Sequence, residues 1–185
     1  MSNSPPIDKT AIRHASTVIV LRDRHTAPRI LMGQRGAKAA FMPNKFVFPG
    51  GAVDAADVDI PLAGKINPRC HTHLTQKTDA DRTHALGVAA IRELWEETGL
   101  ILGTKGIWDS TPPADWTEYA ATGHLPDASA LQFVFRAITP PGRPRRFDAR
   151  FFLIDAEALH GDIDDFSNAS DELSHLQWIA LEDVR

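Results

Sequence analysis

Three glutamates within five residues are the chain's most informative chemical feature. Glu93, Glu96 and Glu97 stand at positions i, i+3 and i+4 of a segment with helical character, so they share one helix face. Like charges at this spacing destabilise an isolated helix by roughly a few tenths of a kcal/mol, which a bound cation would relieve. Carboxylate oxygens suit Mg²⁺ or Mn²⁺. We therefore expect these three residues to be metal ligands; the alternative is a solvated acidic helix face.

The segments on either side of the glutamates set the limits of this helix. An apolar run at residues 46–51 ends in two adjacent glycines, which predicts a short strand and a sharp turn whose backbone is open to close approach. Downstream, Gly99 stands where a helix C-terminus favours a residue that tolerates positive φ. We expect the helix to begin near Asp79 or Asp81 and to face the core with an apolar stripe.

The strand, the glycine turn and the helix together resemble the signature of the Nudix hydrolases. That signature reads G-x5-E-x7-R-E-U-x-E-E-x-G-U, where U is aliphatic, and residues 92–100 match its second half at every specified position. A long insertion between Gly51 and Arg92 interrupts the first half. The glutamate of that half has two possible counterparts: Asp57, by its spacing from Gly51, and His84, by its spacing from Arg92.

A long insertion at this point is similar to that in the subgroup of peroxisomal coenzyme A diphosphatases. Residues 31–51 keep the spacing of that subgroup's motif, L-L-T-x-R-[SA]-x3-R-x3-G-x3-F-P-G-G. Arg35 matches the first arginine, whereas Ala40 and Asn44 replace the second arginine and the glycine. The resemblance implies coenzyme A or acyl-coenzyme A as substrate, with ADP-ribose or dinucleoside polyphosphates as alternatives.

The family resemblance implies an enzyme, a pyrophosphohydrolase dependent on Mg²⁺ or Mn²⁺. It would split a nucleoside diphosphate linked to a group X by water attack on a diphosphate phosphorus. A divalent ion suits this reaction because it neutralises the diphosphate and lowers the pKa of a bound water. The rival class is a Nudix-fold module that binds a nucleotide metabolite without hydrolysis, and the complete set of three glutamates favours the enzyme.

Further residues around the signature have two interpretations each. Arg92 either contacts the diphosphate or forms an internal ion pair that orients the glutamate helix, and we favour the ion pair. Gly50 and Gly51 either offer backbone contacts to the substrate or only permit the turn. By resemblance, the general base is either a glutamate of the helix or an acidic residue on a distant loop, for which Glu172 is the candidate.

Three arginines are candidates for binding substrate phosphates. Arg35, Arg145 and Arg146 could each form charge-assisted hydrogen bonds with phosphate oxygens, although arginines at strand edges are common. Cys70 and the histidines near it match no standard zinc spacing, so zinc is not expected.

Composition narrows the class of protein. A chain of 185 residues is long enough for one sizeable core, and a net charge of −4 gives no general attraction to a nucleic acid polymer. A single cysteine cannot form an internal disulfide. The sequence also lacks a run of about 18 apolar residues, so a membrane span is not expected. We expect a cytoplasmic protein that binds a small-molecule diphosphate, and the sequence leaves a homodimer open.

The expected architecture is one Nudix domain over residues 1–185, of the α/β class. The resemblance implies a mixed sheet sandwiched between helices (α/β/α). We expect a loose N-terminal arm over about residues 1–15 and a surface insertion over about residues 55–80, which covers the active site or only decorates it. Strands are expected at residues 16–22, 29–34, 45–48, 100–102, 131–138, 148–154 and 174–179, and a short helix at residues 115–121.

Overall fold

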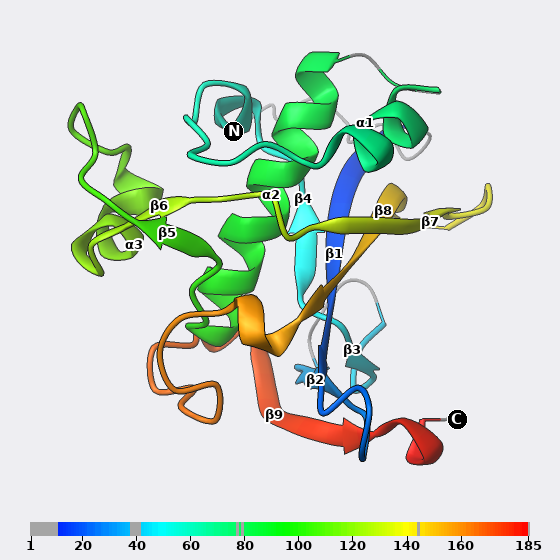
Figure 1. Ribbon diagram of the computed structural model, residues 1–185. Coiled ribbons are helices and arrows are strands. Elements are labelled where there is room, and N and C mark those ends of the chain that lie inside the picture. Colours follow the sequence, from blue (N-terminus) through cyan, green and yellow to red (C-terminus); the bar gives the residue numbers. More distant parts are fainter. Residues whose placement is uncertain (1–10, 38–41, 77, 79, 144, 185) are drawn as a thin grey trace, which may run out of the picture.

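A seven-stranded mixed sheet forms the centre of the computed structural model, which describes residues 11–37, 42–76, 78, 80–143 and 145–184 (Figure 1). The strand order is β3-β2-β1-β8-β7, with β4 paired to β1 and β9 paired to β2. The strands are β1 (Ile12–Arg22), β2 (Arg29–Arg35), β3 (Phe46–Val47), β4 (Gly50–Ala52), β7 (Gln132–Ile138), β8 (Arg146–Asp155) and β9 (Leu173–Ala180).

The sheet is mixed because β1 and β8 run parallel while the other pairs are antiparallel. The parallel register extends from Ile12 opposite Arg146 to Leu21 opposite Asp155. Alternation of side chains along β1 sends Val18 and the other even-numbered residues to one face. The Oγ of Ser16 on that face donates to the carbonyl of Leu86, at 2.6 Å, so this face of β1 is the one that meets helix α2.

Helix α2 (Ala80–Thr98) crosses this face of the sheet (Figure 1). Leu86, Ile91 and Leu94 are fully buried and form part of the apolar stripe that packs on the sheet. The helix stops before Gly99, whose φ of 73° is in the left-handed region that ends helices. The expected helix and its apolar stripe are confirmed, but Asp79, one of the two predicted caps, lies outside the described residues.

A two-stranded ribbon lies beside α2. It consists of β5 (Gly103–Lys105) and β6 (His124–Pro126), joined through a 3₁₀ turn η2 (Ala114–Trp116) and helix α3 (Thr117–Ala121). The buried hydroxyl of Tyr119 donates to the carbonyl of Leu102 at 2.8 Å, and its ring meets that of Trp95 edge-on at 5.8 Å. These contacts fix the ribbon to α2. The short helix expected at residues 115–121 is present as the 3₁₀ turn η2 followed by α3.

The α/β class and the mixed sheet expected from the sequence are confirmed. Two strand predictions need correction. β1 begins at Ile12 rather than Ser16 because its first residues pair with β8, so residues 12–15 belong to the sheet and not to a loose arm. The strand expected at residues 100–102 is wrong: the strand is β5, and Ile101 makes only an isolated bridge with His160, since Leu100 and Leu102 turn into the core.

The segment expected as a surface insertion contains regular structure of its own. It includes a 3₁₀ turn η1 (Ala55–Val58) and helix α1 (Pro68–Thr75). Helix α1 begins with Pro68 after Asn67, whose side chain accepts from the Cys70 N–H at 3.0 Å. Ile60, Ile66 and Leu74 are buried in the core, so this part of the chain helps to build the fold.

The remaining helical segments are short. A 3₁₀ turn η3 (Ala156–Ala158) follows β8, and another, η4 (Leu181–Asp183), follows β9. Residues 1–10 of the expected arm lie outside the described residues. None of the described helices combines the length and the apolar character needed to cross a membrane.

Candidate active site

The glutamates lie on the C-terminal half of α2, where that helix meets β4. Gly51 permits this approach, because a Cβ atom at its position would collide with the Glu93 carboxylate. Gly50 has a φ of 152°, and a Cβ there would collide with the backbone carbonyl of Ser16. The two glycines therefore bring the backbone of β4 against the glutamate face of the helix.

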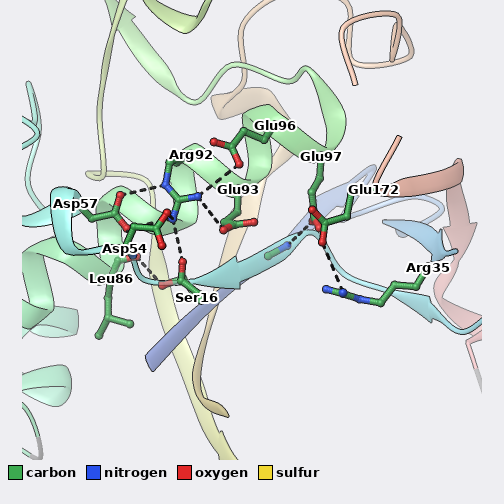
Figure 2. Close-up of polar contacts among 12 residues, drawn as sticks. Ser16, Arg35, Asp54, Asp57, Leu86, Arg92, Glu93, Glu96, Glu97 and Glu172 are labelled. Atoms are coloured by element: carbon green, nitrogen blue, oxygen red, sulfur yellow. Dashed lines mark hydrogen bonds and ion pairs between the residues drawn. The ribbon is translucent and has the colours of Figure 1, made fainter. Parts of the chain in front are cut away.

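Arg92 is the centre of a buried network of ion pairs (Figure 2). Its Nη1 donates to Glu93 at 2.8 Å and to Glu96 at 3.4 Å, and its Nη2 donates to the carbonyl of Ala52 at 2.9 Å. Burial lowers the pKa of this guanidinium, but the hydrogen bonds that it donates to Asp57 and the charge of Glu93 raise the pKa by more. A guanidinium bonded in this way orients the helix and its carboxylates, as the ion-pair interpretation predicts.

Asp57 is the partner of Arg92 that the sequence left undecided. Its two carboxylate oxygens accept from Nε and Nη2 of Arg92, both at 3.1 Å, and it is only 1% exposed. It also accepts from the Asp54 N–H at 2.8 Å, which closes the η1 turn. The other candidate, His84, bonds instead to the carbonyl of Ile60 at 2.8 Å. Spacing from Gly51 had made Asp57 one of two candidates, and its contacts with Arg92 decide between them.

Glu97 combines deep burial with an unsatisfied oxygen. One of its oxygens accepts from the Gly50 N–H at 2.7 Å, whereas Oε1 is buried and has no hydrogen-bond partner among the described residues. Burial raises the pKa of Glu97 to about 8; the Gly50 N–H opposes this shift, and the charges of Glu93 and Glu172 add to it. A buried carboxylate of this kind is costly unless a cation or a proton compensates its charge.

The other two glutamates share this excess of negative charge. Burial raises the pKa of Glu93 to about 7 even though Arg92 opposes the shift. Burial also raises the pKa of Glu96, whose side chain is 38% exposed and so reaches the surface of the cluster. Arg92 alone does not neutralise three glutamates and Asp57, so the cluster is short of positive charge.

The carboxylate oxygens of the cluster are the kind of ligand atom that a hard divalent cation binds. Carboxylate oxygens are the ligands that Mg²⁺ and Mn²⁺ prefer, and Oε1 of Glu97 is a buried acceptor that lacks a donor. As the side chains are placed, no three His, Cys, Asp or Glu residues of the described ranges converge closely enough to hold an ion. Glu93 points to Arg92 instead, so an ion would have to draw the glutamate side chains together.

Glu172 and Arg35 come to the same cluster from distant parts of the chain. The loop before β9 is fixed to the end of α2 by a hydrogen bond of 2.8 Å from the Ser170 N–H to the carbonyl of Glu96. Figure 2 shows Glu172 directed toward Glu97, and its Oε1 lies 3.7 Å from Nη1 of Arg35. Glu172 is close enough to raise the pKa of both Glu93 and Glu97. These two candidates therefore join the helical glutamates.

Arg145 and Arg146 do not join this cluster. They lie at the start of β8, where Arg146 is half-buried and its Nε donates to the carbonyl of Thr139 at 3.1 Å, while Arg145 is exposed. A different arginine of the same hairpin, Arg143, lines the pocket beside the glutamates, and the sequence did not single it out.

The pocket has a volume of about 790 Å³ and adjoins the glutamate cluster through Gly51 and Arg35. Its lining is mainly apolar and aromatic. The residues that line it are Ala15, Thr17, Arg35, Met42, Val47, Phe48, Gly51, Ala137, Ile138, Thr139, Pro140, Arg143, Phe147, Ala149 and Phe151. A cavity of this size next to convergent charged groups is suited to a small-molecule ligand.

Comparison with curated proteins identifies Nudix relatives, although no family model matches the chain. A putative nudix hydrolase 7 from Caenorhabditis elegans is 31% identical over 186 residues, which cover 94% of this chain and 54% of that protein. The acyl-coenzyme A diphosphatase NUDT19 from Gallus gallus is 28% identical over 182 residues, which cover 67% of this chain and 47% of that protein. The chain thus spans about half the length of the curated relatives that it matches.

Solved structures agree with this relationship. A NUDIX hydrolase from Alicyclobacillus acidocaldarius superposes with a TM-score of 0.66 at 28% identity, covering 94% of this chain and 81% of that one. A MutT NUDIX hydrolase from Burkholderia pseudomallei gives a TM-score of 0.51 at 18% identity, covering 95% and 88%, and shows the shared fold alone. The expectation from residues 92–100 is therefore confirmed, and the chain belongs to the Nudix hydrolase family.

Proposed function

We propose that the chain is a pyrophosphohydrolase that uses Mg²⁺ or Mn²⁺ to hydrolyse a nucleoside diphosphate linked to another group. The observation that supports this most strongly is the buried, unpartnered oxygen of Glu97 within a cluster of glutamates at the edge of a ligand-sized pocket. A purely structural cluster would be expected to satisfy its buried oxygens within the protein.

The residues of the cluster have different proposed tasks. Glu93, Glu96 and Glu97 hold the divalent ion, which when bound supplies charge neutralisation at the diphosphate and a more acidic water. Arg92 and Asp57 keep the glutamate face of α2 in place through their two hydrogen bonds. This leaves Arg92 as a positioning residue, since its donors are engaged within the protein.

Substrate contacts are proposed for the groups that lie between the glutamates and the pocket. Arg35 lines the pocket, and its one ion pair with a described residue is the long one with Glu172, so its guanidinium is available for a charge-assisted bond to a phosphate. Gly51 lines the pocket too, whereas the Gly50 N–H already donates to Glu97. Of the two glycines, Gly51 is therefore the better candidate for a backbone contact.

Two residues compete for the role of general base. Glu172 lies on a loop at the edge of the cluster, and its side chain is 59% exposed, so a water molecule has access to it. Glu97 has a pKa of about 8, which is suited to accepting a proton near neutral pH. We favour Glu172, because Glu97 is already assigned to the metal and bonded to the Gly50 N–H.

For the substrate we propose coenzyme A or acyl-coenzyme A. The relative from Gallus gallus is named an acyl-coenzyme A diphosphatase, and Arg35 keeps its place in the coenzyme A motif. ADP-ribose and dinucleoside polyphosphates remain alternatives with the same chemistry. A module that binds a nucleotide without hydrolysis is the alternative of a different class.

Product analysis by liquid chromatography tests the proposal. The chain is incubated with coenzyme A, acyl-coenzyme A, ADP-ribose and dinucleoside polyphosphates in the presence of Mg²⁺, Mn²⁺ or a chelator. Metal-dependent formation of 3′,5′-ADP and a phosphopantetheine is the expected result. Formation of AMP from ADP-ribose would show that ADP-ribose is the substrate and that the proposed chemistry is right. Binding without any cleavage would support the non-catalytic module.

A further inference from the structure

Strand β9 has one extra residue opposite β2, close to the start of β9. The register of the two strands shifts by one residue between Met32 and Gln34. As a result, Gly33 alone faces two residues of β9, His175 and Leu176. Such a β-bulge bends its strand and re-aims the side chains next to it, and bulges are frequent beside active sites. We refer to this feature as the β9 bulge.

The β9 bulge depends on an unusual backbone conformation. His175 has a φ of 51°, in the left-handed region that few residues other than glycine adopt. Its side chain is exposed, and its Nδ1 lies 3.1 Å from the hydroxyl oxygen of the neighbouring Ser174. A residue in this conformation costs about 1–3 kcal/mol, and such residues cluster at functional sites. The surrounding structure therefore maintains the bulge against a cost.

Gly33 provides the space that the β9 bulge occupies. A Cβ atom at Gly33 would lie 2.9 Å from Cβ of Leu173 and 2.9 Å from Cδ2 of Leu176. Contacts this short would force β9 away from β2, because the Cβ of Leu173 cannot move without its backbone. The missing side chain of Gly33 thus allows the two strands to lie close together at the bulge.

The bulge also reverses the alternation of side chains along β9. Leu173 and Leu176 would both meet a Cβ at Gly33, so they lie on the same face of the sheet. Residues three positions apart point to opposite faces in a regular strand. The extra residue removes this mismatch, and Leu173 is buried as a result. The bulge therefore decides how the chain enters β9.

Glu172 is the residue that immediately precedes β9. Leu173 is in register with Arg35, and Oε1 of Glu172 lies 3.7 Å from Nη1 of Arg35, within the glutamate cluster (Figure 2). The preceding turn is fixed by the hydrogen bond from the Ser170 N–H to the carbonyl of Glu96. A slip of one residue would turn Leu173 to the other face and move Glu172 away from this place.

We propose that the β9 bulge positions the Glu172 carboxylate for catalysis, and that the positive φ of His175 and the missing side chain of Gly33 maintain the bulge. Neither residue lines the pocket, so both are positioning residues that act through Glu172. The inference rests on the proposed function, in which Glu172 is the general base. A base must lie within hydrogen-bond reach of its proton, and a misplacement of about 1 Å can cost about 100-fold in rate.

The test compares H175V with H175G. Both variants remove the imidazole, but valine disfavours a positive φ whereas glycine adopts it freely. For H175V we expect kcat to fall at least about 10-fold and KM to change less than about 2-fold, because the base is displaced and the pocket is not. H175G should keep the full rate. His175 is exposed, so both variants should fold, and their melting temperatures check this.

G33A is a second and independent variant. Its added methyl group should displace Leu173 and lower kcat in the same way, whereas G36A is the control, since a Cβ at Gly36 has no heavy atom within 4 Å. Both H175V and G33A are then combined with E172Q. In that background they should change the rate less than about 2-fold, because they act through Glu172. A general effect on packing would persist in the E172Q background.

The outcomes separate this inference from the proposed hydrolysis. An undiminished kcat in H175V, a loss shared with H175G, or a loss that persists in the E172Q background would overturn the positioning role while the hydrolysis stands. So would an E172Q variant with the full rate. If the unmodified chain cleaves no substrate, the proposed hydrolysis fails, and crystal structures of H175V and H175G decide. A Glu172 carboxylate displaced from Arg35 in H175V alone would support the positioning role, and an unmoved carboxylate would overturn it.

Discussion

Arg92 forms two hydrogen bonds of 3.1 Å with Asp57, a residue 35 positions earlier in the chain. This pair joins the two halves of the interrupted Nudix signature across the insertion. Because Arg92 also bonds to Glu93 and Glu96, the pair holds the metal-ligand candidates at a fixed distance from β4. The position of the glutamates thus depends on Asp57, a residue that precedes helix α2 in the sequence.

Replacing Asp57 by Ala should destabilise the fold strongly. The change leaves the buried Arg92 guanidinium without its main partner, and breaking a buried ion pair in this way costs about 3–5 kcal/mol. Urea denaturation measures the effect. D54A is the control, because the Asp54 side chain is 54% exposed and 3.6 Å from Arg92, which predicts a loss of about 1 kcal/mol or less. Equal losses in the two variants would contradict the assignment.

Replacing Gly51 by Ala should reduce hydrolysis more than it reduces stability. The added methyl group meets the Glu93 carboxylate, which must then move away from β4. The comparison is with G36A, since a Cβ at Gly36 has no heavy atom within 4 Å. Rates and melting temperatures are measured for both. Normal hydrolysis by G51A would show that the close approach of Glu93 to β4 is not needed.

Stability of the metal-free chain should fall as pH rises from about 4.5 to about 8. The ordinary pKa of glutamate is 4.5, and that of Glu97 in the folded state is about 8, so the folded state holds a proton that the unfolded state loses in this range. Glu93, with a pKa of about 7, acts in the same direction. Below pH 4.5 both glutamates are protonated in either state, and their contribution is fully present.

A divalent ion should reverse this loss. Mg²⁺ compensates the ionised carboxylates, so the rise in melting temperature on adding Mg²⁺ should be larger at pH 8 than at pH 5.5. Scans at both pH values, with Mg²⁺ or a chelator, measure the difference. A Mg²⁺ effect that does not depend on pH, or no effect at all, would contradict a metal site built from these glutamates.

Glu172→Gln should slow hydrolysis if Glu172 is the general base, by about 100-fold or more. The pH–rate profile should also lose its acidic limb, because the titrating group is gone. An unchanged rate would return the role of base to the helical glutamates. Glu157→Gln is a suitable control, since Glu157 is an exposed acidic residue on η3, outside the cluster and the pocket.

The sequence predicted the parts of the structure that depend on local patterns. Helix α2 was predictable because its apolar residues recur with helical period and Gly99 marks its end. Strands β2 and β9 were predictable from their β-type composition. Helix α1 was missed because it is short and its start depends on one Asn67 cap. Strand β6 was missed because it too is short, with three residues.

Long-range contacts account for what the sequence left open. Asp57 and His84 were equally suitable by spacing, and only the folded η1 turn decides between them. The pocket depends on the register that aligns Ala15, Ala149 and Ala137 of its lining, which no local pattern specifies. Arg143 was overlooked for the same reason, since its position next to the pocket follows from the strand order.

The most direct test of the metal-dependent hydrolysis is the rate of coenzyme A cleavage by the unmodified chain and by E96Q, with Mg²⁺ and with a chelator. Gln keeps the volume of Glu96 and removes its charge, so E96Q should stay folded and lose about 100-fold or more of the rate. E118Q, on the exposed face of α3, should keep the full rate. We predict cleavage that needs Mg²⁺ and Glu96. Cleavage that persists in chelator, or that is undiminished in E96Q, would contradict the assignment of the glutamate cluster as the catalytic metal site.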